Sequence, residues 1–395
     1  MMDALLGDPE VIDAVAVLSD GGSPEERAAR AAWSVVAEPG DGVAGALIGE
    51  LGAAEALRFA VATSSEDRAV AEASEQARGA IAEARARWKP RADPRAVRDA
   101  LVAATHVGAR LVVPGDATWP SRLADLGVHA PAALWVRGDP AHLVAGRAVS
   151  VVGARAATAY GEHVAAELAG DLAAGSAVVV SGGAYGIDGA AHRAALGTGG
   201  VTVAFLAGGV DRAYPAGHQQ LFARITTTGT VVSELPCGAA PTKWRFLARN
   251  RLIAALGDAT VVVEAGWRSG SLNTAGHAAA LGRPLGAVPG PVTSAASAGC
   301  HRLMREYDAR CVTSAAEVRE LAGYESTDAY DPERPDHDRT RLLDALSPRS
   351  RRSVMDLARR SGLSQARVTA LLGILSLEGI VAGEENGWRR VTTAG

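Results

Sequence analysis

The chain has 395 residues, enough for two or three domains that each bury a core. Its formal net charge of −4 gives no global reason to expect a nucleic-acid or acidic-membrane partner, so such a function must come from a local patch. Three cysteines without CxxC spacing disfavour a disulfide framework or a zinc site, and the lack of a signal peptide or an apolar run of about 20 residues predicts a cytoplasmic protein without a membrane segment.

Residues 1–105 are rich in alanine and favour helices. Glycines separate several short helical stretches, and residues 66–87 are expected to form one longer helix. We interpret this part as a helical accessory domain, and a helix-hairpin-helix that contacts DNA is the alternative. Residues 108–139, with two short apolar runs around turns, connect it to the middle of the chain.

Short β-branched runs recur through the middle of the chain, and segments with helical spacing separate most of them. These runs cover residues 148–152, 177–181, 201–207, 230–234, 259–265 and 284–289. Buried strands that alternate with helices indicate βαβ units, whose right-handed crossovers cover both faces of a sheet. The pattern therefore predicts an α/β fold, a Rossmann-like doubly wound and mostly parallel sheet.

The composition changes twice after the predicted sheet. Residues 324–338 carry six acids against one arginine and predict a flexible linker. Residues 339–395 carry ten arginines against five acids, with three helical segments and a hairpin signal at Asn386-Gly387, which predicts a winged helix-turn-helix. For this module, contact with DNA and contact with protein are both open. The predicted division is a helical domain 1–105, a Rossmann-like domain 106–322, a linker 323–338 and a winged helix 339–395.

Glycine-rich turns follow four of the predicted strands: Gly153-Ala154-Arg155, Ser181-Gly182-Gly183-Ala184, Gly208-Gly209 and Ser269-Gly270-Ser271. The carboxyl ends of parallel strands meet at one edge, where ligands bind, and glycine lets the backbone approach an anion. The turn in VVGARAAT, after the run at 148–152, lacks the second and third glycines of GxGxxG, and GxxxxGK[ST] does not occur in the sequence, so a dinucleotide site and ATP hydrolysis are disfavoured. Arg155 fits a phosphate ligand because its planar fork binds two oxygens, although it could instead bridge loops.

The stretch PTKWRFLARNR, residues 241–251, gathers four cations and two aromatic residues without an acid. It follows the strand at 230–234 and therefore enters the same edge. Cations along a backbone and aromatic faces for bases are typical of single-stranded nucleic-acid binding, whereas a solvated helix face is the alternative. Four phosphate contacts would give a slope of log K against log salt of about −3.

Candidate catalytic groups are scattered. Asp188 and His192 stand four residues apart, but Asp188 also fits a helix cap and His192 a bond to backbone. Glu234 and Glu264 each follow a strand and could pair as acid and base or close the edge by accepting loop N–H groups. We predict no catalytic residue, no metal and no cofactor.

Ordered motifs from about residue 108 to 314, among them VVGARAATAYG, VVSGGAYGIDGAAHRAAL and PTKWRFLARNRLIAAL, resemble the DNA-processing protein A family, DprA (also called Smf). The tail is similar to its winged-helix domain, and the amino end to its sterile-alpha-motif-like domain. The resemblance implies a homodimer, not an enzyme, that binds single-stranded DNA and loads the recombinase RecA onto DNA entering by natural transformation.

The resemblance also implies the binding pocket. Its residues here are Gly153, Ala154, Arg155, Ser181, Gly182, Gly183, Ala184, Lys243, Phe246, Arg249, Asn250 and Arg251, and we add Gly270 and Ser271 from the turn after the strand at 259–265. Two departures stand out: Leu247 replaces the Pro of FPxRNR, and His301 replaces the Asn of GxNxLI.

Two other functions fit a related Rossmann-like fold. Nucleotide-processing phosphoribohydrolases resemble this core but carry a PGGxGTxxE loop, whereas the corresponding turn here reads GWRSGSLNTA. A nucleotide sensor without catalysis is the third possibility.

Overall fold

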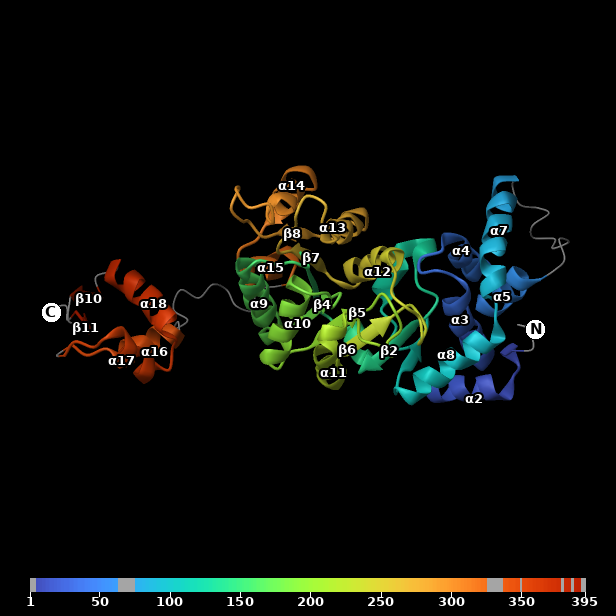
Figure 1. Ribbon diagram of the computed structural model, residues 1–395, viewed down its shortest axis with the longest axis horizontal. Helices are drawn as coiled ribbons and strands as arrows, with labels where there is room; N and C mark the ends of the chain where they lie inside the picture. Colours follow the sequence, from blue (N-terminus) through green and yellow to red (C-terminus); the bar gives the residue numbers. More distant parts are fainter. Residues whose placement is uncertain are drawn as a thin grey trace. The chain divides into compact units, whose positions relative to one another are not determined.

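The computed structural model describes residues 5–62, 75–324, 337–348, 350–377, 380–384 and 387–391. The chain forms two compact units, Met1–Glu325 and Ser326–Gly395 (Figure 1). Residues 66–74 of the predicted long helix and residues 325–336 of the predicted linker lie outside the described part.

The predicted helices at the amino end are confirmed. They are α2 (Pro9–Leu18), α3 (Pro24–Val36), α4 (Gly42–Leu51), α5 (Ala53–Val61), α7 (Glu75–Trp88) and α8 (Pro94–His106), with α7 as the described part of the longer helix predicted at 66–87. The side chains of Asp8, Ser23, Asp41 and Asp93 accept N–H groups of the first turn of the helix that each one caps. Trp33 and Trp88 meet edge to face at 5.1 Å in the core between these helices.

A nine-stranded sheet follows, in the order β1-β2-β6-β5-β4-β3-β7-β8-β9. Its strands are β1 (Arg110–Val112), β2 (Leu134–Gly138), β3 (Ala148–Val152), β4 (Val178–Ser181), β5 (Thr202–Phe205), β6 (Thr230–Ser233), β7 (Ala259–Val262), β8 (Leu285–Ala287) and β9 (Arg310–Cys311). Strands β3 to β8 confirm the six predicted strands. In this sheet order, every pair of neighbouring strands from β6 through β5, β4, β3, β7 and β8 to β9 is parallel. Strands β1 and β2 pair antiparallel with each other, and β2 pairs antiparallel with β6.

Helices cover both faces, as a doubly wound sheet requires (Figure 1). One face packs against α9 (Ala159–Ala174), α10 (Ile187–Gly197) and α15 (Ala315–Leu321), and the other against α12 (Lys243–Leu256), α13 (Ser271–Ala280) and α14 (Ala298–Glu306).

Helix α11 (Gln219–Thr228) and the amino-terminal helices share a core with the sheet. Trp135, Ala204 and Val231 contribute the sheet side of this core. The amino-terminal helices therefore belong to the same compact unit as the sheet, and the domain boundary at residue 105 stays a prediction.

The second unit contains the predicted winged helix. It consists of α16 (His337–Ala345), α17 (Val354–Ser361), α18 (Gln365–Leu377) and the antiparallel strands β10 (Val381–Glu384) and β11 (Gly387–Arg390). Gly362, with φ of +70°, ends α17 in the left-handed conformation that permits the turn into α18. Across the described parts of both units, no helix combines the length and the apolar character that crossing a membrane would require.

Candidate nucleic-acid interface

A cleft of about 780 Å³ lies at the carboxyl ends of β3 and β7. The chain proceeds outward from β3 to β6 and then returns to place β7 on the other side of β3. Such a reversal of strand order is the position at which doubly wound sheets bind ligands. The cleft therefore occupies the edge that the glycine-rich turns predicted.

Most of the predicted site residues line this cleft. They are Gly153, Ala154, Arg155, Ala184, Lys243, Phe246, Arg249, Asn250, Gly270 and Ser271. Four predicted residues are not part of its lining: Ser181, Gly182, Gly183 and Arg251. The first three form the buried turn that supports Ala184, and Arg251 is directed elsewhere, as described below.

Helix α12 forms one wall because its residues at spacings of three and four lie on one face. Lys243, Phe246, Asn250 and Ile253 all line the cleft. Thr242 caps the helix by accepting the Arg245 N–H at 3.3 Å. The cap fixes where the helix begins, so Lys243 stands in its first turn at the entrance.

Three exposed cations line the cleft: Arg155, Lys243 and Arg268. Within the described part of the chain, none of the three forms an ion pair. Asp188 is the one acid among the described lining residues, and it is buried. Sequence reasoning missed Arg268, although its place next to Ser269 in the turn after β7 was an available signal.

An aromatic pair stands beside these cations. The Cζ atom of Arg155 lies 4.6 Å from the ring centroid of Phe246, and the Tyr214 ring lies 5.5 Å from it. Such contacts hold a guanidinium and aromatic rings in one surface. Tyr214, which is 50% exposed, was not singled out from the sequence. The cleft thus offers cations and half-exposed rings at adjoining positions.

Arg249 reaches the cleft but is a buried residue, 5% exposed. Its guanidinium donates to the carbonyl oxygens of Gly182, at 2.7 Å, and Phe205. A Cβ atom at Gly182 would lie 2.6 Å from the guanidinium nitrogens, so a larger residue there would displace the guanidinium. Burial lowers the pKa of Arg249 to about 10. Its donors support the turn after β4, which leaves the exposed cations as the better phosphate ligands.

Asp188 caps the same turn. Its carboxylate accepts the N–H groups of Gly182 at 3.1 Å and Ala184 at 3.3 Å. Burial raises the pKa of Asp188, and the charge of Arg249 opposes that shift. The helix-cap interpretation of Asp188 is wrong: the N-cap of α10 is Gly186, without a side-chain cap bond, and Asp188 instead accepts N–H groups of the turn before the helix.

The two glutamates do not pair with each other. Glu234 accepts Arg251 Nη2 at 2.8 Å, and Glu264 accepts the N–H of Thr158 at 2.9 Å. Arg251 is buried in this contact rather than in the cleft. Both carboxylates therefore close the edge by accepting neighbouring N–H groups.

At the second departure from the family pattern, His301 Nε2 lies 3.0 Å from the carbonyl oxygen of Gly290.

His192 is buried, and its Nδ1 lies 2.7 Å from the hydroxyl of Thr202 rather than from a backbone group. Burial, with smaller effects of neighbouring cationic groups, lowers the pKa of His192 from 6.5 to about 3. Below pH 6.5, the ordinary pKa of histidine, His192 therefore binds a proton in the unfolded chain but not in the folded chain. The stability that neutral His192 contributes is complete above that pKa and is lost as the pH falls toward 3.

We expect the free energy of unfolding to fall by up to about 1.4 kcal/mol per pH unit in this window through His192 alone. Urea denaturation at several pH values between these limits measures it. His192→Gln should remove this share of the pH dependence, and an unchanged slope in the variant would contradict the assignment.

Fold and cleft together define a class: a Rossmann-like protein with a basic and aromatic ligand site at the switch point of its sheet. Residues 110–323 match the family model of DNA recombination-mediator protein A, and residues 326–387 match the model of the DprA winged helix domain. The chain belongs to the DNA recombination-mediator protein A family, the DprA or Smf proteins, which confirms the resemblance inferred from the motifs.

Relatives and solved structures agree with this membership. The chain is 47% identical over 302 residues to a putative DNA processing protein DprA of Mycobacterium tuberculosis, covering 71% of this chain and 77% of the relative. It is similar to the crystal structure of DprA from Streptococcus pneumoniae, with a TM-score of 0.54 and 35% identity over 61% of this chain and 85% of that one. It is also similar to DNA processing protein A of Helicobacter pylori, whose structure addresses its single-stranded DNA binding mode, with a TM-score of 0.50 and 28% identity over 55% and 96% of the chains.

Proposed function

We propose that this protein binds single-stranded DNA in the cleft between β3, β7 and α12. The observation that carries the proposal is the set of three exposed, unpaired cations, Arg155, Lys243 and Arg268, beside the Phe246 ring. Phosphates would meet the cations while a base stacks on the aromatic surface. The single-stranded DNA binding mode of the Helicobacter pylori relative supports the same ligand. Gly153, Ala154, Ala184, Asn250, Gly270 and Ser271 would supply the close backbone and polar contacts.

Binding should depend on salt in a defined way. Of the four cations in residues 241–251, Arg249 and Arg251 are buried and Arg245 does not line the cleft. We therefore count three phosphate contacts, from the exposed lining cations Arg155, Lys243 and Arg268. At roughly −0.7 per contact on single strands, log K should fall against log salt with a slope of about −2. Fluorescence anisotropy with labelled single- and double-stranded oligonucleotides at several salt concentrations measures it. Binding that ignores salt, or that prefers the duplex, would refute the proposal.

We also propose that the protein acts as a cytoplasmic recombination mediator, by binding rather than by catalysis. In this role a homodimer formed through the Rossmann-like domain protects incoming DNA during natural transformation and loads RecA onto it. The recombination-mediator description of its family supports the role. The test is the assembly of the cognate RecA on single-stranded DNA already covered by a single-strand-binding protein. Assembly that this protein does not accelerate would argue against loading.

A further inference from the structure

Helix α12 has a second face that does not line the cleft. Arg245 and Arg251 lie on it, whereas Lys243, Phe246 and Asn250 line the cleft. Arg245 binds the loop between α3 and α4, residues 37–41, directly through Glu38, and Arg251 is linked to it through Glu234, which also accepts the N–H of Gly40. The amino-terminal helices therefore hold the helix that forms the cleft wall.

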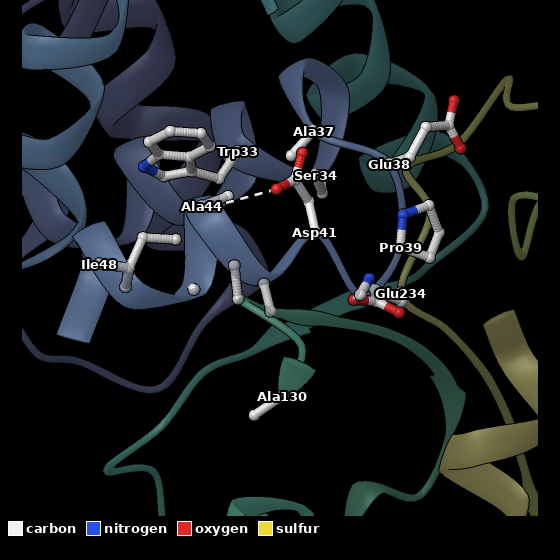
Figure 2. A pocket seen from close by; sticks show the side chains of 14 residues that line it. Trp33, Ser34, Ala37, Glu38, Pro39, Asp41, Ala44, Ile48, Ala130 and Glu234 are labelled. Carbon is white, nitrogen blue, oxygen red and sulfur yellow. Dashed lines mark hydrogen bonds between the residues drawn. The ribbon is translucent and has the colours of Figure 1, made fainter. Parts of the chain in front are cut away.

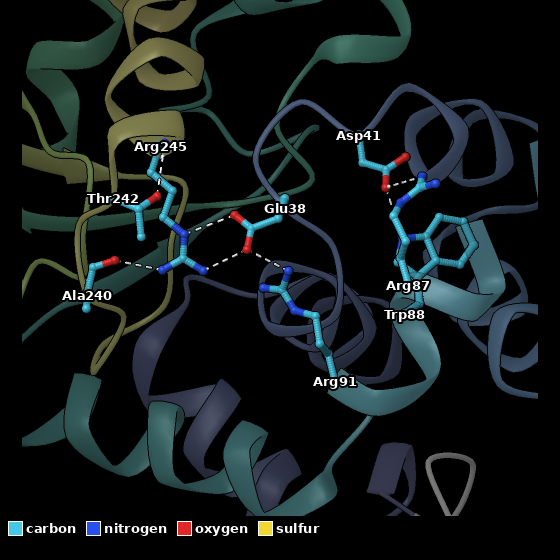
Figure 3. Close-up of polar contacts among 8 residues, drawn as sticks. All are labelled: Glu38, Asp41, Arg87, Trp88, Arg91, Ala240, Thr242 and Arg245. Atoms are coloured by element: carbon cyan, nitrogen blue, oxygen red, sulfur yellow. Dashed lines mark hydrogen bonds and ion pairs between the residues drawn. The ribbon is translucent and has the colours of Figure 1, made fainter. Parts of the chain in front are cut away.

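The first attachment is an ion pair between Glu38 and Arg245 (Figure 3). Arg245 Nε and Nη2 donate to the two carboxylate oxygens of Glu38 at 2.9 and 2.8 Å, and Nη1 donates to the carbonyl oxygen of Ala240 at 2.7 Å. Such two-pronged contacts fix direction as well as distance. All three guanidinium nitrogens are therefore engaged by protein. Arg91 Nη1 also donates to Glu38, at 2.6 Å, which ties the carboxylate to the segment after α7.

The second attachment lies farther along α12. The N–H of Gly40 donates to Glu234 at 3.3 Å, and Glu234 accepts Arg251 Nη2 at 2.8 Å. The carbonyl oxygen of Gly40 lies 2.9 Å from His129 Nδ1, and Arg251 Nε donates to the carbonyl oxygen of His129 at 3.0 Å. Gly40 has a φ of +76°, and a Cβ atom there would lie 3.1 Å from Arg251 Nε. A larger residue at position 40 would therefore crowd the Arg251 side chain.

The junction behind the loop is closely packed. A cavity of about 30 Å³ lies between it, α4 and Glu234, with Trp33 and Asp41 in its lining (Figure 2). That volume is enough for one or two water molecules. Asp41 is itself anchored, because the indole N–H of Trp88 donates to it at 3.0 Å (Figure 3). The loop therefore has little room to shift without moving α12.

We propose that Glu38 is a positioning residue for the cleft: by holding Arg245 it fixes the first turn of α12 and so the direction of Lys243 and Phe246. This role rests on the proposed binding of single-stranded DNA. The amino-terminal helices would then contribute to DNA binding without contacting DNA themselves. A ligand that shifts the loop at 37–41 would change the affinity for DNA, and DNA would change the affinity for that ligand by the same factor.

A competing role would have the opposite sign. If Glu38 only masked Arg245, its removal would release a cation close to Lys243 and add a phosphate contact. DNA binding would then become tighter, and the salt slope would steepen by roughly 0.7. The salt slope therefore distinguishes three roles. It stays unchanged on loss of a positioning contact, steepens on loss of a masking contact, and flattens on loss of a direct contact with DNA.

The experiment compares full-length wild type, Glu38→Ala, Arg245→Ala and the double variant by anisotropy on a single-stranded oligonucleotide at several salt concentrations. Each single variant should weaken binding about two- to fivefold, the upper part of the range expected for losing one partly exposed ion pair, with an unchanged salt slope. The double variant should bind like the single variants because both remove the same contact. Glu50→Ala is the matched control: it removes one exposed carboxylate from α4, without a described partner, and should bind like wild type.

Urea denaturation of each variant accompanies the binding measurement. If Glu38→Ala does not fold, Glu38→Gln replaces it beside Arg245→Ala, because it removes the charge of Glu38 while keeping the size of the side chain. Unchanged affinity in the folded variants, or tighter binding with a steeper slope, would overturn the positioning role alone. Wild-type protein that binds no single-stranded DNA would overturn the proposed function, and the positioning role with it.

Discussion

Phe246→Ala should weaken binding of single-stranded DNA by about 1–3 kcal/mol, or roughly 5- to 150-fold, the usual loss when a base loses an aromatic partner. The ring lies in the cleft wall with Arg155 4.6 Å from its centroid and Tyr214 beside it. Its removal takes away both the stacking face and the surface that orients Arg155. Because every base has a π-face, oligonucleotides of different sequence should weaken alike.

Two companion variants make this result specific. Trp244→Ala removes a side chain that is 79% exposed on the same helix but does not line the cleft, so affinity should stay at the wild-type level. Arg155→Ala should flatten the salt slope by roughly 0.7, whereas Phe246→Ala should leave the slope unchanged because it removes no cation. Wild-type affinity in Phe246→Ala would exclude this ring as a stacking platform.

Arg249→Ala should lower the free energy of unfolding by about 2–4 kcal/mol, as expected when a buried charged donor is removed and two buried carbonyl groups lose it. Asp188 would lose the favourable charge of Arg249, and the carbonyl groups of Gly182 and Phe205 would lose their donor. Urea denaturation measures the change.

Arg155→Ala is the matched control, since it removes an exposed arginine from the same cleft and should leave the free energy of unfolding nearly unchanged. The opposite pattern is informative. An Arg249→Ala protein with wild-type stability and a flatter salt slope would show that Arg249 contacts phosphate, as its motif predicted.

The sequence alone determined the architecture and the location of the site. Runs of valine and alanine at regular intervals predicted β3 to β8 because a strand buried on both faces needs apolar side chains throughout. The glycine-rich turns predicted the cleft because the carboxyl ends of parallel strands meet at one edge. Lys243 and Phe246 were assigned to that edge because their stretch follows the strand at 230–234 and matches the family motif, and both line the cleft.

Only the tertiary structure decided which cations of PTKWRFLARNR remain exposed. The helical pattern orders side chains around α12, but burial depends on what packs against each face from elsewhere in the chain. Arg249 is bound by the turn at Gly182, 67 residues away, and Arg245 by Glu38, 207 residues away. Such distant partners leave no local signal in the sequence. The packing of the amino-terminal loop and the turn after β4 therefore separates the arginines that are bound by other parts of the protein from the cations that remain exposed in the cleft.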